Sequence, residues 1–194
     1  LGIRAEVVRS SGVDVSGCAS ERMYTSWMNG QSTARTRGLS RPCHAGRVRL
    51  SHSLRIDRPT DAVFAWIEDP ERAVQWQPEV AEYEVMHETP EVVGTEGREV
   101  LRGSSGRAEM RVRVTAYDAN RLMAFHLAGD GLRIDTAYEP APAGGGTRLT
   151  VRTDLRLPGL LGRVMEPFVR PRISRHMRNE LATLKRLCEA EQTA

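Results

Sequence analysis

Two side chains of this sequence could move protons near neutral pH, His52 and Tyr138. His52 alternates with Leu50 and Leu54, so it shares the apolar face of a predicted strand. Tyr138 lies in a second period-two run, on the face that carries Ile134. An imidazole titrates near neutrality, and a phenol can donate or accept a proton. We therefore take both as candidate catalytic residues; a structural core histidine and a hydroxyl that serves the neighbouring backbone are the alternatives.

Other side chains on the same faces could contact a bound molecule. The hydroxyls of Thr136 and Thr153 lie among apolar strand residues and could orient a ligand's carbonyl or hydroxyl groups, or bond the nearby backbone instead. Trp76 and Tyr83 could line an entrance, although large aromatic rings also serve simply as packing. The full set of predicted ligand-binding residues is His52, Trp76, Tyr83, Met110, Val112, Phe125, Thr136, Tyr138, Thr153, Phe168 and Met177.

Several other chemistries find no support in the sequence. It contains no Gly-x-Ser-x-Gly elbow, no His-Glu-x-x-His pair and no dinucleotide fingerprint, so we predict neither a cofactor nor a metal site. The three cysteines, Cys18, Cys43 and Cys188, lie far apart and form no Cys-x-x-Cys pair. Four glutamates on neighbouring strands could pair as acid and base, but solvated strand faces explain them better: Glu82, Glu84, Glu96 and Glu99.

The distribution of charge argues against nucleic acid as a partner. The formal net charge is +3, but residues 47–194 contain equal numbers of basic and acidic residues, and the excess lies in residues 1–46. A neutral domain offers little attraction for phosphates. No segment reaches the roughly 20 apolar residues of a membrane span, so we expect no stable membrane insertion. The cysteine pattern fits a reducing compartment, which predicts a cytoplasmic protein.

Residues 1–46 are predicted to form a disordered N-terminal arm. They are rich in Ser, Gly, Arg and Thr and show little periodicity, so they cannot bury enough apolar surface to offset chain entropy. The sequence begins with Leu1, and Met23 and Met28 lie inside the arm. One hypothesis is therefore that part of this arm is a translated upstream region.

The segment from Leu54 to Pro78 changes period twice and defines the start of the domain. A strand pattern ending at Ile56 is followed by Pro59 and by apolar residues at helical spacing. Asp69 and Pro70 then have the types that begin a second helix, which should end near Trp76. The sequence thus predicts one strand followed by two short, abutting helices.

The rest of the chain predicts an antiparallel meander and a long helix. Period-two runs near 79–87, 96–102, 108–117, 122–127, 132–139 and 147–157 are separated by turn residues. A stripe at helical spacing closes the domain, with a bend or break expected before it at Pro167 and Pro171. The residues of this stripe are Ile173, Met177, Leu181, Leu184 and Cys188.

The order of these elements over residues 47–190 resembles the START-like or helix-grip (SRPBCC) superfamily, including bacterial polyketide cyclase/dehydrase-type proteins. The motifs that carry the resemblance are Ile56-x-x-Pro59-x-x-x-Val63-Phe64, Asp69, Trp76-x-Pro78, Gly146-Thr147-Arg148-Leu149-Thr150 and Leu181-x-x-Leu184-Lys185. The resemblance implies an α+β fold in which a curved antiparallel sheet of six to seven strands wraps around the long C-terminal helix and leaves an apolar cavity. It transfers no catalytic residue.

Three functions remain open at this point. The first is binding of a hydrophobic small molecule, such as a lipid, quinone or polyketide-like metabolite, in that cavity. The second is a polyketide cyclase or aromatase that uses the same cavity, with His52 or Tyr138 moving protons. The third is an interaction module that engages a protein or a membrane. Neither the ligand nor the oligomeric state follows from the sequence.

Overall fold

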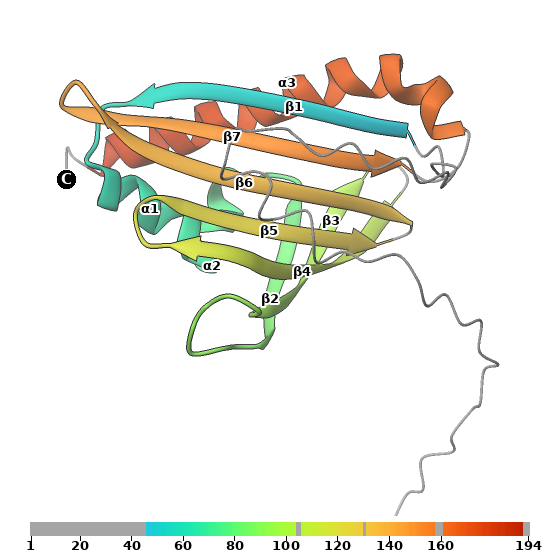
Figure 1. Ribbon diagram of the computed structural model, residues 1–194, viewed down its shortest axis with the longest axis horizontal. Coiled ribbons are helices and arrows are strands. Elements are labelled where there is room, and N and C mark those ends of the chain that lie inside the picture. Colours follow the sequence, from blue (N-terminus) through green and yellow to red (C-terminus); the bar gives the residue numbers. More distant parts are fainter. Residues whose placement is uncertain (1–45, 104–105, 130, 158–160, 192–194) are drawn as a thin grey trace, which may run out of the picture. The chain divides into compact units, whose positions relative to one another are not determined.

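The computed structural model describes residues 46–103, 106–129, 131–157 and 161–191, and within them the chain forms a seven-stranded sheet and three helices (Figure 1). The predicted arm lies outside these residues, except for Gly46, which begins the first strand. The elements are β1 (Gly46–Ile56), α1 (Thr60–Glu68), α2 (Pro70–Trp76), β2 (Val80–His87), β3 (Glu96–Gly103), β4 (Gly106–Asp118), β5 (Leu122–Gly129), β6 (Leu132–Ala143), β7 (Gly146–Leu157) and α3 (Leu161–Ala190).

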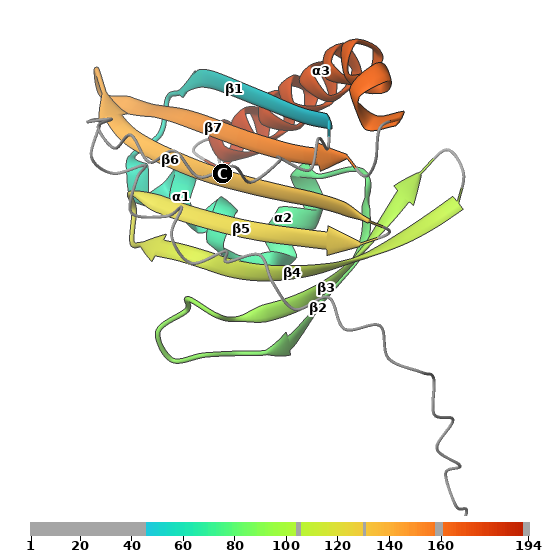
Figure 2. The same cartoon turned by 45° about the vertical axis from the view of Figure 1, so that its right-hand side comes forward.

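The sheet is antiparallel throughout and has the order β1-β7-β6-β5-β4-β3-β2. From β2 to β7 each strand pairs with the next one along the chain, and β1 then adds to the outer edge of β7. Figures 1 and 2 show that β2 and β3 run in a different direction from β6 and β7, so that the sheet curves around the helices. This arrangement confirms the predicted helix-grip fold.

The hairpin between β6 and β7 is longer than the sequence predicted. The predicted strands end near residue 139 and begin again near residue 147, but Pro140 pairs with Leu149 and Pro142 with Thr147. Pairing with β5 ends at Tyr138, so the two prolines lie where β6 has no neighbour on that side and a missing N–H is tolerated. Gly144 and Gly145 make the turn with positive φ angles of 56° and 82°.

Local hydrogen bonds and Pro70 set where the two short helices begin and end. The Asp69 carboxylate accepts hydrogen bonds from the backbone N–H of Glu71 at 2.9 Å and of Arg72 at 3.4 Å, which caps α2. In a continuing helix, the Trp66 carbonyl would accept a hydrogen bond from the N–H four residues later. That residue is Pro70, which has no N–H. The indole of Trp76 donates to the Trp66 carbonyl instead, at 3.0 Å. This buried bond ties α1 to α2.

The C-terminal helix α3 packs its predicted stripe on the sheet. Met177, Leu181, Leu184 and Cys188 are buried, and Ile173 packs partly buried beside them. The helix continues through Pro167 and Pro171, so of the predicted bend or break the break is absent. A proline inside a helix removes one backbone donor and crowds the carbonyl four residues before it, which favours a bend of the helix axis. Lys185 donates to the Arg55 carbonyl at 2.8 Å, which fixes α3 against β1.

Candidate functional site

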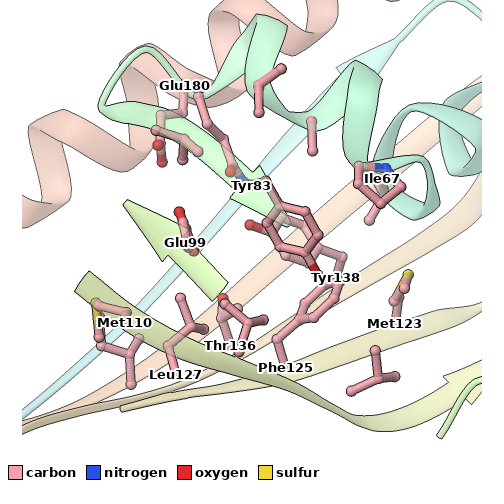
Figure 3. A pocket seen from close by; sticks show the side chains of 18 of the residues that line it. Ile67, Tyr83, Glu99, Met110, Met123, Phe125, Leu127, Thr136, Tyr138 and Glu180 are labelled. Atoms are coloured by element: carbon pink, nitrogen blue, oxygen red, sulfur yellow. The ribbon is translucent and has the colours of Figure 1, made fainter. Parts of the chain in front are cut away.

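A cavity of about 700 Å³ lies between the concave face of the sheet and the three helices. Every strand from β2 to β7 contributes lining side chains, and so do α1, α2, α3 and the connection between β2 and β3. Figure 3 shows apolar side chains such as Met110, Phe125 and Leu127 along the sheet wall. A volume of this size can enclose a drug-sized molecule.

All but two of the predicted ligand-binding residues line this cavity. For the members of this set that lie on strands, alternation predicts the inward direction, because side chains on one parity of a strand share one face of the sheet. The residues that line it are Trp76, Tyr83, Met110, Val112, Phe125, Thr136, Tyr138, Thr153 and Met177. Their contact with a ligand stays a prediction.

His52 points to the predicted face of the sheet but does not line the cavity. Helix α3 lies directly over β1, and the imidazole Nε2 of His52 is 3.1 Å from the Ser174 hydroxyl on that helix. Burial and the nearby charge of Arg178 lower the pKa of His52. The residue faces a separate shallow groove beside Arg170 and Pro171. His52 therefore lies apart from the cavity that the other candidates line.

Phe168 also lies outside the cavity, and its surface is 70% exposed. It precedes Met177 by nine residues, which at about 100° per residue puts it half a turn away from the buried stripe. Helical periodicity thus explains why Met177 contributes to the wall while Phe168 faces solvent.

Tyr138 contacts two other aromatic side chains of the cavity wall. Its ring packs edge-on against Trp76 at 5.9 Å and against Phe125 at 6.1 Å between ring centroids. Burial raises the pKa of Tyr138 well above its usual range, and the charges of Glu180 and Glu99 raise it further. The hydroxyls of Thr136 and Thr153 lie 3.0 Å apart on adjacent strands nearby. Tyr138 is therefore a neutral donor rather than a source of phenolate.

Glu99 is the principal functional candidate that the sequence analysis missed. It was assigned to a solvated strand face, but its side chain lines the cavity and the residue is only 7% exposed (Figure 3). Burial and, next, the charge of Glu180 raise the pKa of Glu99 to about 7. Among the described residues, none donates a hydrogen bond to its carboxyl group. The other three glutamates of that set are exposed, as predicted: Glu82, Glu84 and Glu96.

The strand register explains the position of Glu99. Its own strand has apolar residues on both parities, Val100 and Leu101, so alternation alone defines no inward face. In the β3–β4 hairpin Gly103 pairs with Gly106, and counting back from there puts Glu99 opposite Met110. Directly paired residues share a face. The turn signal at 103–106, combined with the inward parity of Met110, could have identified Glu99.

Helix α3 adds a second polar group to the cavity wall. The imidazole of His176 is 3.0 Å from a Glu180 carboxylate oxygen and 3.3 Å from one of Glu79, which precedes β2. The hydrogen bond with Glu180 raises the pKa of His176 most, against the opposing effect of burial. His176, Glu180 and Glu79 all line the cavity. None of the three was a candidate in the sequence analysis, because their grouping depends on how α3 crosses the sheet.

Tyr83 lies on β2 beside a glycine of the neighbouring strand. A Cβ atom at Gly97 would come within 2.6 Å of the Tyr83 hydroxyl oxygen and 2.9 Å of its Cζ atom. Gly97 thus leaves the space in which the Tyr83 ring lies against the sheet. Burial, with a smaller effect from the charge of Glu99, raises the pKa of Tyr83.

The described part of the chain shows neither a metal centre nor a membrane-spanning helix. No group of three or more His, Cys, Asp or Glu side chains in it has the arrangement needed to hold a metal ion. None of its helices combines the length and the apolarity that crossing a bilayer requires.

The fold recurs in solved structures of low sequence identity. The protein TTHA0849 from Thermus thermophilus aligns with a TM-score of 0.62 and 20% identity, over 75% of this chain and 98% of that one. The Zhui aromatase/cyclase from Streptomyces sp. R1128 aligns with a TM-score of 0.61 and 13% identity, over 74% and 94%. The two-domain ARO/CYC protein StfQ of the steffimycin pathway aligns with a TM-score of 0.64 and 12% identity. The alignment covers 76% of this chain and 52% of that one. At these identities the likeness shows the fold alone.

The sequence itself is matched at the level of a family. No curated protein matches the chain significantly. Residues 47–189, however, match the family model described as polyketide cyclase / dehydrase and lipid transport, which covers the whole domain built by the sheet and α3. The chain therefore belongs to the polyketide cyclase / dehydrase and lipid transport family.

Proposed function

We propose that this protein binds a hydrophobic small molecule, such as a lipid, quinone or polyketide-like metabolite, in the cavity between the sheet and α3. The observation that carries this proposal is the cavity itself, about 700 Å³ in a domain of this size. Side chains that would otherwise fill a core instead line an open space, and burying a ligand's apolar surface there is favourable by about 25 cal/mol per Å².

Hydroxyl and carboxyl groups interrupt the mostly apolar wall of the cavity, which suits orientation of a ligand. Tyr138 and the Thr136–Thr153 pair lie on the sheet wall, and Glu99 lies nearer to α3 (Figure 3). A mostly apolar pocket with a small number of hydrogen-bonding groups is the usual form of a small-molecule site.

Native mass spectrometry of gently purified protein, together with a thermal-shift panel of lipophilic compounds, tests this proposal. A co-purifying small molecule, or a midpoint that rises with ligand concentration, is expected. Failure of both measurements would remove the support for a ligand-binding container and would favour an interaction module.

A second candidate is a cyclase or aromatase in the same cavity, and Glu99 is the observation that favours it. A carboxyl group with a pKa of about 7 can both accept and donate a proton at neutral pH. It could remove a proton beside a carbonyl group, while the neutral phenol of Tyr138 donates a hydrogen bond to the carbonyl oxygen. The apolar walls would hold a flexible chain in a reactive conformation.

Variants separate the two candidates. In an enzyme, Glu99→Gln and Tyr138→Phe should each reduce turnover of a poly-β-carbonyl substrate by about 100-fold or more while changing ligand affinity little. His52→Ala is the matched control, because His52 lies outside the cavity. Unchanged turnover in both cavity variants would exclude this acid–base assignment.

A further inference from the structure

The charged groups of the cavity have one sign. Among its described lining residues there is neither lysine nor arginine, although the chain contains 28 of these residues. The carboxyl groups that line the cavity are Glu68, Glu79, Glu88, Glu99 and Glu180. His176 is the one lining side chain of the described set that can become cationic, and it is held between Glu79 and Glu180.

Glu99 is the acid in this set that lacks a partner. Glu68 accepts a hydrogen bond from Tyr117 at 3.0 Å, Glu79 and Glu180 are paired with His176, and Glu88 is exposed. Glu99 is only 7% exposed, and its side chain enters the cavity from the sheet wall (Figure 3). It accepts no hydrogen bond from any described residue. A buried, unpaired carboxyl group costs free energy unless a donor or a cation compensates it.

From this arrangement we infer that the preferred ligand is a lipophilic amine, whose protonated nitrogen pairs with Glu99 while its apolar part fills the cavity. A cationic head supplies the donor and the charge that the protein itself does not provide. A carboxylate or phosphate head would instead meet Glu99 and Glu180, and the one basic side chain there, His176, is already held between Glu79 and Glu180. This inference rests on the proposed binding function and specifies its ligand class.

Three probes with the same decyl chain and different heads test the inference: decylamine, decanol and decanoic acid. Each is titrated below its micelle concentration against a neutral fluorescent reporter bound to the full chain, and its dissociation constant is obtained from displacement. At pH 8 the amine should bind about tenfold or more tightly than the alcohol, and the acid should bind most weakly.

The pH dependence, compared between the wild type and Glu99→Gln, identifies the group that binds the amine, because His176 also titrates in this cavity. The groups that face Glu99 are Tyr83 on β2, Tyr138 on β6, and His176 and Glu180 on α3, with Glu79 beside them. With a pKa of about 7, Glu99 is mostly protonated at pH 6 and mostly ionised at pH 8. The amine remains protonated at both, so its affinity should rise by up to about tenfold between them, whereas decanol should show no change.

Two variants complete the design. Glu99→Gln should reduce the preference for the amine over decanol to within about threefold and remove most of its rise with pH, leaving the part that comes from His176. Glu84→Gln removes a carboxylate from the exposed face of the sheet, where it pairs with Arg98, and should behave as wild type. At pH 8, where Glu99 is mostly ionised, both variants remove about one negative charge, so a difference between them reports the cavity and not overall electrostatics.

Several outcomes overturn the inference, and they separate it from the proposed function. If decanol binds the wild type as tightly as decylamine does at pH 8, the inferred ligand class is wrong, but the proposed binding of a hydrophobic molecule in the cavity still stands. A preference for the amine that persists in Glu99→Gln would disprove the role of Glu99. Binding of none of the three probes would reject the container and the ligand class together. The wild-type preference for decylamine over decanol and decanoic acid at pH 8 tests the ligand class even if a variant fails to fold.

Discussion

Glu99 on β3 and Glu180 on α3 point into the same cavity from its two walls, the sheet and the helix. Burial and then the charge of Glu180 raise the pKa of Glu99 to about 7. Glu99 thus binds a proton more strongly in the folded protein than in the unfolded chain, where an ordinary glutamate titrates near 4.3. The pair places an acid that is half-protonated near neutrality inside an apolar site.

Removing the charge of Glu99 should change how stability depends on pH. Because its folded pKa is raised, ionisation costs stability, and the wild type loses free energy of unfolding as pH rises from the unfolded pKa to about 7. Glu99→Gln cannot ionise. Its stability relative to wild type should therefore increase by up to about 3 kcal/mol between pH 4.5 and pH 8. Urea denaturation at several pH values measures this difference, and a constant difference would contradict the prediction.

His176 should also make the wild type less stable as pH rises, but for a different physical reason. Its pKa is raised by the hydrogen bond with Glu180, so its contribution is present in full below its unfolded pKa and is lost as pH rises through the folded pKa. His176→Gln should be less stable than wild type at pH 6, by up to about 1 kcal/mol, because the partly exposed pair is screened. At pH 9 this difference should disappear.

An NMR titration of the His176 imidazole provides a direct check. A measured pKa above about 6.5 is expected, and a value at or below it would show that the contact with Glu180 does not favour the protonated ring. The titration in Glu180→Gln serves as the control, since the pKa should fall when this partner is removed.

Gly97 and Tyr83 should be energetically coupled. A methyl group at Gly97 would collide with the Tyr83 phenol, so Gly97→Ala should destabilise the protein by about 1–3 kcal/mol and displace the ring toward the cavity. In a Tyr83→Ala background most of this cost should vanish, leaving the milder contact with the Glu84 carbonyl at 3.1 Å. A double-mutant cycle from denaturation curves measures the coupling, and additive effects would argue against the contact.

The bond between Trp76 and the Trp66 carbonyl should contribute measurably to stability. Trp76→Phe keeps an aromatic ring but leaves that buried carbonyl without its donor, for an expected loss of about 1–3 kcal/mol in the free energy of unfolding. Phe168→Ala also alters a large aromatic residue, but one that is 70% exposed, and should change stability by less than about 0.5 kcal/mol. Equal losses in both variants would contradict the structural assignment.

The parts of the molecule that depend on local chemistry were predictable from the sequence. Asp69 and Pro70 begin α2 through contacts within one helical turn, and no distant residue is needed for them. The α3 stripe follows from helical spacing. Strand alternation likewise predicted the cavity wall at Met110 and Val112, because parity on a clearly amphipathic strand defines its face.

By itself, then, the sequence determined the element types, their order, the family resemblance and the inward face of the amphipathic strands. Only the tertiary structure decided which inward residues meet open space. His52 has the correct parity, but α3 lies over β1 and occupies the space in front of it. Glu99 enters the cavity because the pairing of β3 with β4 sets its parity. Periodicity determines the face of a strand or helix on which a side chain lies. Whether that side chain is buried, and against what, depends on which other elements pack on that face.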